Sequence, residues 1–202
     1  MQPDQFDLWR SNYRGSSVED HADFYRRIHS EYPDQKHYNL EAVLAFLGAV
    51  QERRFMVVEL GGYDGALAKE CLEATGRIQS WANYDICSPE ILQPSDRRYV
   101  AIKLEQQFWE MSVLPHAEVF VASHVIEHLD RTDFLSLLDC IQCVPYVFFD
   151  SPLGDSVAVD WTGATAAHVL DISWDEVVRA MELRGFELFG TTGSSRSFRK
   201  MP

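Results

Sequence analysis

The sequence predicts an α/β fold with a mostly parallel sheet of seven strands and helices on both of its faces. From residue 55 onward, short apolar runs alternate with amphipathic segments of helical period. This alternation is typical of parallel strands joined by right-handed crossover helices. The last two runs are joined by a segment too short for a crossover, so we expect them to form an antiparallel hairpin.

The strands are predicted from their apolar composition. Residues 55–60, "FMVVEL", are almost entirely apolar, as expected of a strand that is buried on both faces of a sheet. Four further parallel strands are expected at residues 80–86, 99–104, 119–123 and 146–150. The two strands of the hairpin are expected at residues 186–192 and 197–201.

The helices are predicted from apolar residues at helical spacing and from residues that favour helix ends. Ser173 with Glu176 three residues later forms a capping-box pattern, and Gly185 is placed to end that helix. Asn39 is similarly placed to begin a helix. The predicted helices cover residues 18–32, 40–53, 66–75, 133–141 and 173–185.

Length, charge and cysteine content limit the class of protein. A chain of 202 residues suits one globular domain, and its net charge of −13 disfavours binding to nucleic acid, because an acidic surface repels phosphate. No apolar run approaches the length of a membrane span, and the N-terminus has no signal-peptide core. We therefore expect a soluble, cytoplasmic protein without membrane partners, whose four cysteines are reduced.

The turn after residues 55–60 is the first candidate for a ligand site, since ligands of open α/β sheets bind beyond the carboxyl ends of the strands. The segment "GGYDG" does not fit the G-x-G-x-x-G pattern of dinucleotide-binding proteins. It fits instead an acidic-x-Gly-x-x-x-Gly pattern of Glu59, Gly61 and Gly65, with Asp85 twenty residues further on. Carboxylates at these two places suit a nucleoside that is attached to an amino acid without a phosphate between them.

Three segments in this order carry a resemblance to a known family. "VVELGGYDG", "NYDI" and "FVASHVIEHL" together resemble the class I S-adenosylmethionine-dependent methyltransferases, especially their small-molecule branch. The resemblance covers residues 39–200 and extends to the C-terminal hairpin. It implies a Rossmann-like, doubly wound fold for residues 39–202, and it implies that residues 1–38 form a helical extension that covers the substrate.

The resemblance also implies which residues bind S-adenosylmethionine and its product, S-adenosylhomocysteine. The residues expected to face the methionine part are Glu59, Gly61, Gly62, Tyr63 and Gly65. Asp85 would hold the ribose, Ile86 would pack on the adenine, and Ser123 and His124 would lie near the sulfonium. The family commonly has an aspartate after the third strand that binds the adenine amine. In this sequence the nearest candidate for that role is Glu105.

The expected reaction is methyl transfer to an oxygen or nitrogen atom of a small-molecule acceptor, in a monomer or a homodimer. If the acceptor must lose a proton, the candidate general bases are His124 and His168. The candidate substrate contacts are Tyr13, His128, Trp161 and His168.

Two other functions are compatible with parts of the sequence. Residues 124–128, "HVIEH", fit the H-x-x-E-H pattern of inverted zinc proteases, which would make the protein a hydrolase using His124 and His128 as zinc ligands. Under the methyltransferase interpretation, Glu127 and His128 instead pack against and cap the helix that follows the fourth strand. Because Tyr63 stands where the family often has glycine, a catalytically degenerate, cofactor-binding partner protein is the third possibility.

Overall fold

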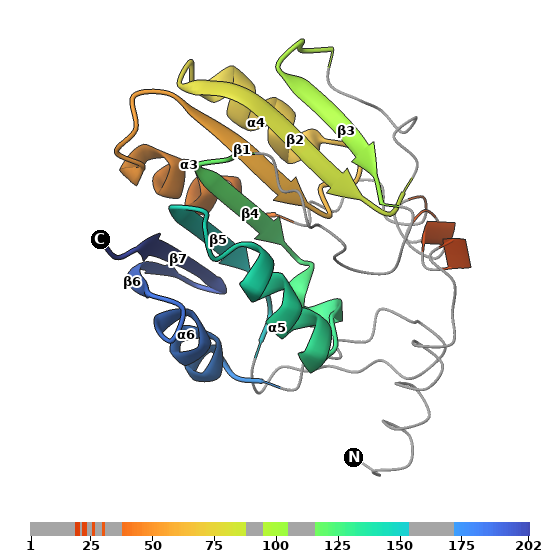
Figure 1. Ribbon diagram of the computed structural model, residues 1–202. Helices are drawn as coiled ribbons and strands as arrows, with labels where there is room; N and C mark the ends of the chain where they lie inside the picture. The colour runs from red at the N-terminus through yellow and green to blue at the C-terminus, as the bar shows by residue number, and fades with distance from the viewer. Residues whose placement is uncertain are drawn as a thin grey trace.

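Seven strands form a single sheet in the order β3-β2-β1-β4-β5-β7-β6 (Figure 1). The computed structural model describes residues 38–87, 95–104, 116–153 and 172–202, and also residues 19, 20, 22, 23, 26 and 30. All neighbouring strands are parallel except for the pairs that β7 makes with β5 and β6. The strands are β1 Phe55–Leu60, β2 Ile78–Asp85, β3 Tyr99–Lys103, β4 Val119–Ser123, β5 Tyr146–Asp150, β6 Phe186–Thr192 and β7 Ser195–Lys200.

Two of the helices in the sheet domain begin at the capping residues predicted from the sequence. Asn39 accepts a hydrogen bond from the Ala42 amide, and Ser173 and Glu176 form the predicted capping box. The helices are α3 Leu40–Ala49, α4 Ala66–Ala74, the short 3₁₀ helix η1 Ile126–His128, α5 Arg131–Cys140 and α6 Trp174–Glu182.

Helix α3 ends at Ala49, four residues before the predicted end at residue 53. The reason is a tertiary contact, because the guanidinium of Arg77 donates hydrogen bonds to the carbonyl oxygens of Leu47, Val50 and Glu52. These bonds satisfy carbonyl groups at and just beyond the helix end, which have no partner within the helix.

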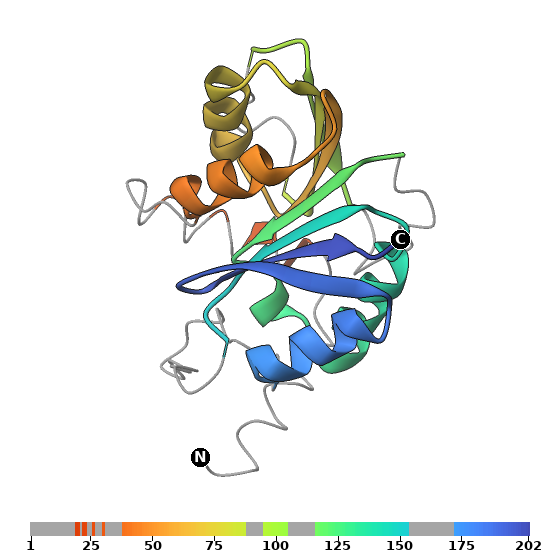
Figure 2. The same cartoon turned by 90° about the vertical axis from the view of Figure 1, so that its left-hand side faces the viewer.

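The helices cover both faces of the sheet, as predicted. Helices α3 and α4 pack on one face and α5 and α6 on the other (Figure 2). Strand β5 shows how one buried strand serves both faces: Tyr146 and Phe148 join the cluster under α3 and α4, whereas Val147 and Phe149 join the cluster under α5 and α6. This two-sided burial explains why the strands are apolar runs without polar alternation.

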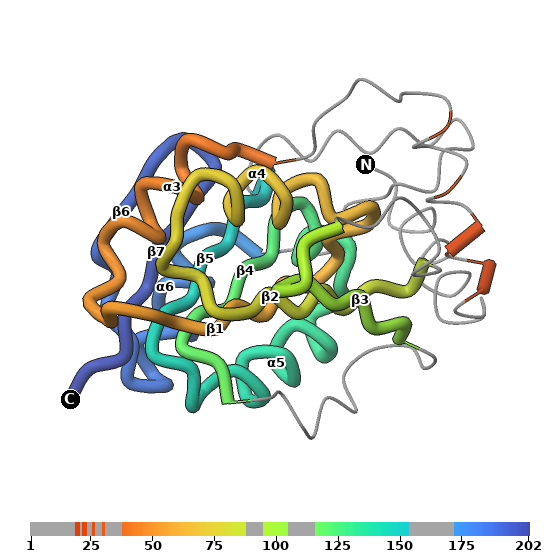
Figure 3. Tube along the Cα trace, turned by 90° about the horizontal axis from the view of Figure 1, so that it is seen from above, coloured from red at the N-terminus to blue at the C-terminus, as the bar shows by residue number. Residues whose placement is uncertain are grey.

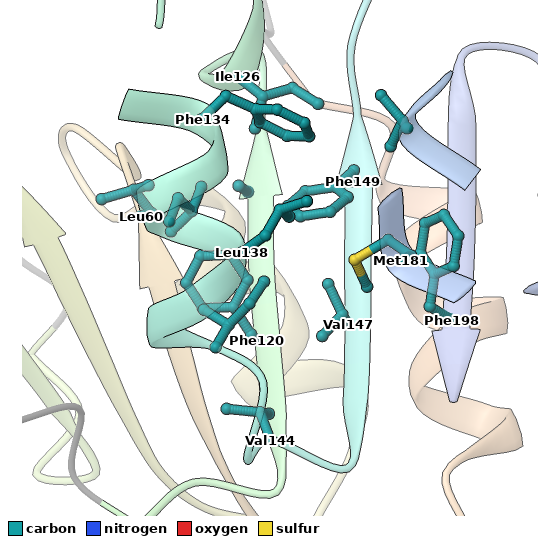
Figure 4. Close-up of a cluster of buried hydrophobic side chains, with 14 of the residues drawn as sticks. Leu60, Phe120, Ile126, Phe134, Leu138, Val144, Val147, Phe149, Met181 and Phe198 are labelled. Carbon is teal, nitrogen blue, oxygen red and sulfur yellow. The ribbon is translucent and has the colours of Figure 1, made fainter. Parts of the chain in front are cut away.

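Phe149 lies near the middle of the cluster under α5 and α6 (Figure 4). Its ring contacts the rings of Phe120 in β4, Phe134 in α5 and Phe198 in β7, with centroids 6.1 to 6.4 Å apart. Aromatic contacts at this separation add to the free energy gained from burial alone. The cluster therefore joins the parallel strands, helix α5 and the C-terminal hairpin.

The predicted C-terminal hairpin is confirmed, although its second strand begins earlier than expected. Only Gly193 and Ser194 separate β6 from β7, and Gly193 adopts a φ of 55°, which a tight two-residue turn requires. The register between the two strands shifts between Leu188 and Gly190. The turn is shorter than the predicted one because pairing continues up to Thr192 and Ser195.

The described residues of the first predicted helix are helical and lie beside the carboxyl ends of β2 and β3 (Figures 1 and 3). Ala22 is completely buried, and its carbonyl oxygen lies 3.9 Å from the Sγ atom of Cys87. Glu19 pairs with the Lys103 Nζ atom at 3.3 Å. The division of the chain into residues 1–38 and 39–202 stays a prediction.

No helix within the described part of the chain is both long enough and apolar enough to cross a membrane.

We predict that Leu138→Ala lowers the free energy of unfolding by about 2–5 kcal/mol, because Leu138 is fully buried on α5 and its loss leaves a cavity. Leu135→Ala on the same helix is the matched control, since Leu135 is 38% exposed and the change in helix propensity is identical. Urea unfolding of both variants measures the difference. Equal losses in the two variants would contradict the packing described here.

Candidate functional site

The candidate site lies where the strand order reverses, between β1 and β4. The connection after β1 leads to α4 on one face of the sheet, and the connection after β4 leads through η1 to α5 on the other face. The two connections therefore separate at the carboxyl ends of their strands. This divergence brings the glycine turn after β1 and the segment "SHVIEH" after β4 to the same edge of the sheet.

The glycines of the turn are required by backbone conformation and by close approach. Gly61 and Gly65 have φ angles of 70° and 76°, in the region that favours glycine. A Cβ atom at Gly61 would lie 2.3 Å from Cγ2 of Val125, and one at Gly62 would lie 2.4 Å from the carboxyl group of Glu59. The turn therefore sits directly over Glu59 and against the segment that follows β4.

Glu59 is a buried carboxyl group beneath the turn. Only 2% of its surface is exposed, and Trp81 Nε1 donates a hydrogen bond of 2.7 Å to its Oε2 atom. Burial raises the pKa of Glu59 to about 8, and the negative charges of Asp85 and Asp64 act in the same direction. A cation held near the turn would favour the ionised form of the Glu59 carboxyl group.

Asp85 ends β2 and holds the glycine turn by hydrogen bonds. Its Oδ2 atom accepts from the Tyr63 amide at 2.8 Å, and its Oδ1 atom accepts from the Cys87 amide at 2.7 Å. Burial raises the pKa of Asp85, although these two hydrogen bonds oppose the shift. Each carboxylate oxygen retains a further lone pair, so a ligand diol can also be bound there. Ile86 follows directly and is half-buried.

Asn83 is a residue of the site that sequence reasoning missed. Its Oδ1 atom accepts from the Gly62 amide at 3.0 Å, and its Nδ2 atom donates to the Tyr99 hydroxyl at 3.0 Å. Asn83 thereby connects the turn to β3. Its position in "NYDI", two residues before Asp85, places it on the same side of β2 and is the signal that could have found it.

Tyr63 has a φ angle of 43°, in the left-handed region that favours glycine. His124, with a φ of 52°, is the other non-glycine residue with positive φ in the described part of the chain. Both residues lie at the candidate site. Backbone strain of this kind persists only where the surrounding structure enforces it, and it is concentrated at functional sites.

His124 directly follows β4 and is held by backbone and side-chain contacts. Its amide donates to the Asp150 carbonyl oxygen at 2.7 Å, and its Nδ1 atom lies 3.2 Å from Oε1 of Glu127. The nearby carboxylate of Glu127 raises the pKa of His124, despite partial burial of the imidazole. Ser123, just before it, is buried at the end of β4.

The structure does not support the zinc hydrolase. His124 has left-handed backbone geometry and η1 contains only three residues, so His124 and His128 do not share one face of a helix. Within the described ranges, no group of three His, Cys, Asp or Glu side chains could hold a metal ion.

The expected capping role of Glu127 and His128 is wrong. Asp130 begins α5, and its side chain accepts from the Asp133 amide at 2.9 Å. Glu127 is instead fully buried between the imidazoles of His124 and His128, whose nitrogens lie 3.2 and 4.0 Å from its Oε1 atom. The helix begins three residues later than a cap at Glu127 requires, because η1 occupies residues 126–128.

The structure brings most of the predicted cofactor residues to one edge of the sheet, namely Glu59, Gly61, Gly62, Tyr63, Gly65, Asp85, Ile86, Ser123 and His124. His128 lies beside them with 16% of its side chain exposed. The remaining predicted residues, Tyr13, Glu105, Trp161 and His168, lie outside the described residues.

Solved structures that are similar to this chain include methyltransferases. The 1,6-didemethyltoxoflavin-N1-methyltransferase of Burkholderia thailandensis is 15% identical, with a TM-score of 0.67 over 92% of this chain and 87% of that one. The magnesium protoporphyrin IX methyltransferase of Synechocystis PCC 6803 is 14% identical, with a TM-score of 0.60 over 89% of this chain and 94% of that one. Both were solved with S-adenosylhomocysteine bound.

Human N-acetylserotonin methyltransferase, solved with S-adenosylmethionine, is 18% identical, with a TM-score of 0.56. The match covers 79% of this chain but only 51% of the human one. These likenesses show the Rossmann-like fold of the class I methyltransferases, as predicted from the sequence. Models of protein families and curated protein sequences give no match.

We predict that Glu59→Gln removes a pH dependence of stability. Because the pKa of Glu59 rises from 4.5 to about 8 on folding, the folded state binds the proton more tightly. The contribution of Glu59 to the free energy of unfolding is therefore fully present below pH 4.5 and is lost as the pH rises to about 8. Glutamine keeps the shape of the side chain and has no proton to lose.

The stability of Glu59→Gln relative to the wild type should thus increase by about 1.4 kcal/mol for each pH unit across this range. Urea unfolding at a series of pH values measures it. Glu73→Gln, at an exposed position of α4, is the control and should show a small, constant difference. The assigned burial of Glu59 would be wrong if both variants gave the same pH profile.

Proposed function

We propose that the protein is an S-adenosylmethionine-dependent methyltransferase that methylates an oxygen or nitrogen atom of a small molecule. The observation that carries this proposal is the acidic glycine turn at the point of strand reversal. Glu59 lies directly beneath Gly62, and Asp85 holds the far side of the turn through the Tyr63 amide. A methyltransferase fold with carboxylates at these two places is suited to a cationic nucleoside.

The residues present fit S-adenosylmethionine. The absence of side chains at Gly61 and Gly62 lets a ligand approach the backbone of the turn, where Glu59 supplies negative charge for an amine or a sulfonium. Asp85 has lone pairs for both hydroxyl groups of a ribose, and Ile86 offers an apolar side chain next to it. When bound, S-adenosylmethionine supplies an electrophilic methyl group.

A small-molecule acceptor is supported by the neighbours and by the charge of the chain. The neighbours named above act on 1,6-didemethyltoxoflavin, magnesium protoporphyrin IX and N-acetylserotonin, according to their names. The net charge of −13 disfavours a nucleic acid as acceptor. The chain itself aligns acceptor and methyl group, which is the principal contribution of a protein to a displacement of this kind.

The acceptor loses a proton during methylation when it is a hydroxyl or a protonated amine. His124 is the candidate base within the described residues, because it stands at the exit of β4 next to the glycine turn. His168 is the second candidate from the sequence. Tyr13, Trp161 and His128 are proposed to contact the acceptor.

We predict that Asp85→Asn weakens the binding of S-adenosylmethionine about 10- to 100-fold, because an amide replaces one of the two carboxylate acceptors. Calorimetric titration with S-adenosylmethionine and S-adenosylhomocysteine measures the effect. Asp139→Asn, at an exposed position of α5, is the matched control and should bind like the wild type. Unchanged affinity in Asp85→Asn would refute the ribose assignment, and no binding by the wild type would refute the function.

We also predict that His124→Asn lowers methyl transfer about 100-fold and keeps the affinity for S-adenosylmethionine within a few-fold. Asparagine is chosen because it tolerates the left-handed backbone of position 124. Transfer of a labelled methyl group to a panel of phenols and heteroaromatic amines gives the rate. His168→Ala is measured in parallel, and a loss found only in that variant would assign the base to His168.

A further inference from the structure

We infer that Arg196 of β7 is an acceptor-binding residue, which pairs through its Nε and Nη2 atoms with a carboxylate group of the small molecule to be methylated. This inference rests on the proposed function and deepens it, since it defines a chemical feature of the acceptor. Three observations carry it: the place of Arg196 beside the ends of β4 and β5, the use of its guanidinium nitrogens, and the aromatic ring that holds it.

Arg196 lies at the edge of the sheet that holds the candidate site, on the strand next to β5 (Figure 1). In the antiparallel pair of β5 and β7 it stands opposite Phe149, one residue before the carboxyl end of β5. The end of β5 is joined to the end of β4, because the His124 amide donates to the Asp150 carbonyl oxygen at 2.7 Å. Neighbouring strands lie about 4.8 Å apart, so β7 lies about 10 Å from β4, a distance that a small molecule spans.

The start of β7 is fixed to the end of β5. The hydroxyls of Ser194 and Ser195 donate to Oδ1 of Asp150 at 2.6 and 3.0 Å. The Ser151 amide donates to the Ser194 carbonyl oxygen at 3.2 Å. Because Asp150 is buried, these bonds form away from water. They hold the backbone of the hairpin turn, and with it Arg196, in place relative to the end of β5.

The fold uses only one of the three nitrogen atoms of the Arg196 guanidinium. Its Nη1 atom donates to the carbonyl oxygens of Gly193 and Ser195 at 2.8 and 2.9 Å. Among the described residues, none accepts a hydrogen bond from its Nε or Nη2 atom, and the charge of Asp175 acts on it without forming an ion pair. Nε and Nη2 together form the side of a guanidinium that binds both oxygens of a carboxylate.

Two other arginines show what this side of a guanidinium binds in the same protein. Arg98 donates from Nε and Nη2 to the two carboxylate oxygens of Asp96, at 3.0 and 2.6 Å. Arg199 of β7 donates from the same two atoms to Oε1 of Glu187. In both cases the partner is a carboxylate of the chain itself. Arg196 carries the same pair of donors next to the candidate site.

The ring of Trp174 holds the Arg196 guanidinium in place. The Cζ atom of Arg196 lies 4.8 Å from the centroid of this ring, within the range of a cation–π contact. Trp174 begins α6 directly after the capping residue Ser173, and its side chain packs against the cluster under α5 and α6. An arginine that is stacked on a ring is already ordered, so it loses little side-chain entropy when it binds an anion.

The surroundings of Arg196 favour an anionic ligand over a neutral one. Arg196 is half-buried, and burial lowers the pKa of its guanidinium. A charge that is partly removed from water interacts more strongly with an anion than an exposed charge does, because the effective dielectric constant around it is lower. In a chain with a net charge of −13, this cation also gives the edge of the sheet a local attraction for an anion.

The first test is the binding of benzoate, with benzamide as the uncharged ligand of similar shape, and it requires neither cofactor nor methyl transfer. Binding is followed by the indole Nε1 signal of Trp174 in NMR spectra, which is assigned by its loss in Trp174→Phe. We expect benzoate to shift this signal and to bind about 10-fold more tightly than benzamide. Arg196→Gln should abolish this preference, whereas Arg179→Gln, at an exposed position of α6, should keep it.

Equal binding of benzoate and benzamide by the wild type would overturn the inference, even if Arg196→Gln does not fold. A preference for benzoate that survives in folded Arg196→Gln would overturn it as well.

The second test is methyl transfer from labelled S-adenosylmethionine to the hydroxyl or amino group of matched acceptors, namely hydroxybenzoates and aminobenzoates against the corresponding benzamides. The wild type should have a kcat/KM about 10- to 100-fold higher for the carboxylates, and Arg196→Gln should lose this preference mainly through a higher KM, because the contact lies away from the reacting atoms. An active wild type that methylates carboxylates and amides equally well refutes the acceptor assignment but leaves the methyltransferase function standing. Absence of S-adenosylmethionine binding by the wild type refutes the function, and the acceptor assignment with it.

Discussion

The pairing of β1 with β2 on one side and β4 on the other is the constraint on which the site depends. Both pairs are parallel, so the three strands end at the same edge of the sheet. The first amide beyond β1, that of Gly61, still bonds to the Tyr84 carbonyl oxygen at 2.8 Å, which fixes the turn to β2 as it leaves the sheet. Because α4 and α5 cover opposite faces, the connections after β1 and β4 turn away from each other at this point.

Three buried carboxyl groups, those of Glu59, Glu127 and Asp150, and the half-buried carboxyl group of Asp85 lie at this edge, and each accepts hydrogen bonds from specific donors. Glu59 accepts from Trp81, and Asp85 accepts from two backbone amides. Glu127 accepts from Ser151, and Asp150 accepts from serines of the C-terminal hairpin. Fixed donors lower the cost of placing several carboxyl groups in a region with little water, and a cation bound near Glu59 would favour the ionised form of its carboxyl group.

The sequence predicted those features that depend on local chemistry. Apolar runs marked the strands, and the glycines with Asp85 marked the turn, because left-handed backbone and buried strands demand particular residues. The roles of Asn83 and Glu127 depend on contacts with β3 and with the end of β5, which no local pattern encodes. The early end of α3 also involves a distant contact, since Arg77 from another part of the chain binds carbonyl oxygens at and just beyond the end of the helix.

The two halves of the site are in direct contact through Gly61 and Val125. A Cβ atom at position 61 would lie only 2.3 Å from Cγ2 of Val125, which stands between His124 and η1. Any side chain at position 61 must therefore displace the segment that sets the orientation of His124 and Glu127. The glycine is thus needed for two reasons at once: it gives the turn its positive φ, and it lets the segment that follows β4 lie against that turn. Packing at this single contact fixes the position of the glycine turn relative to His124 and η1.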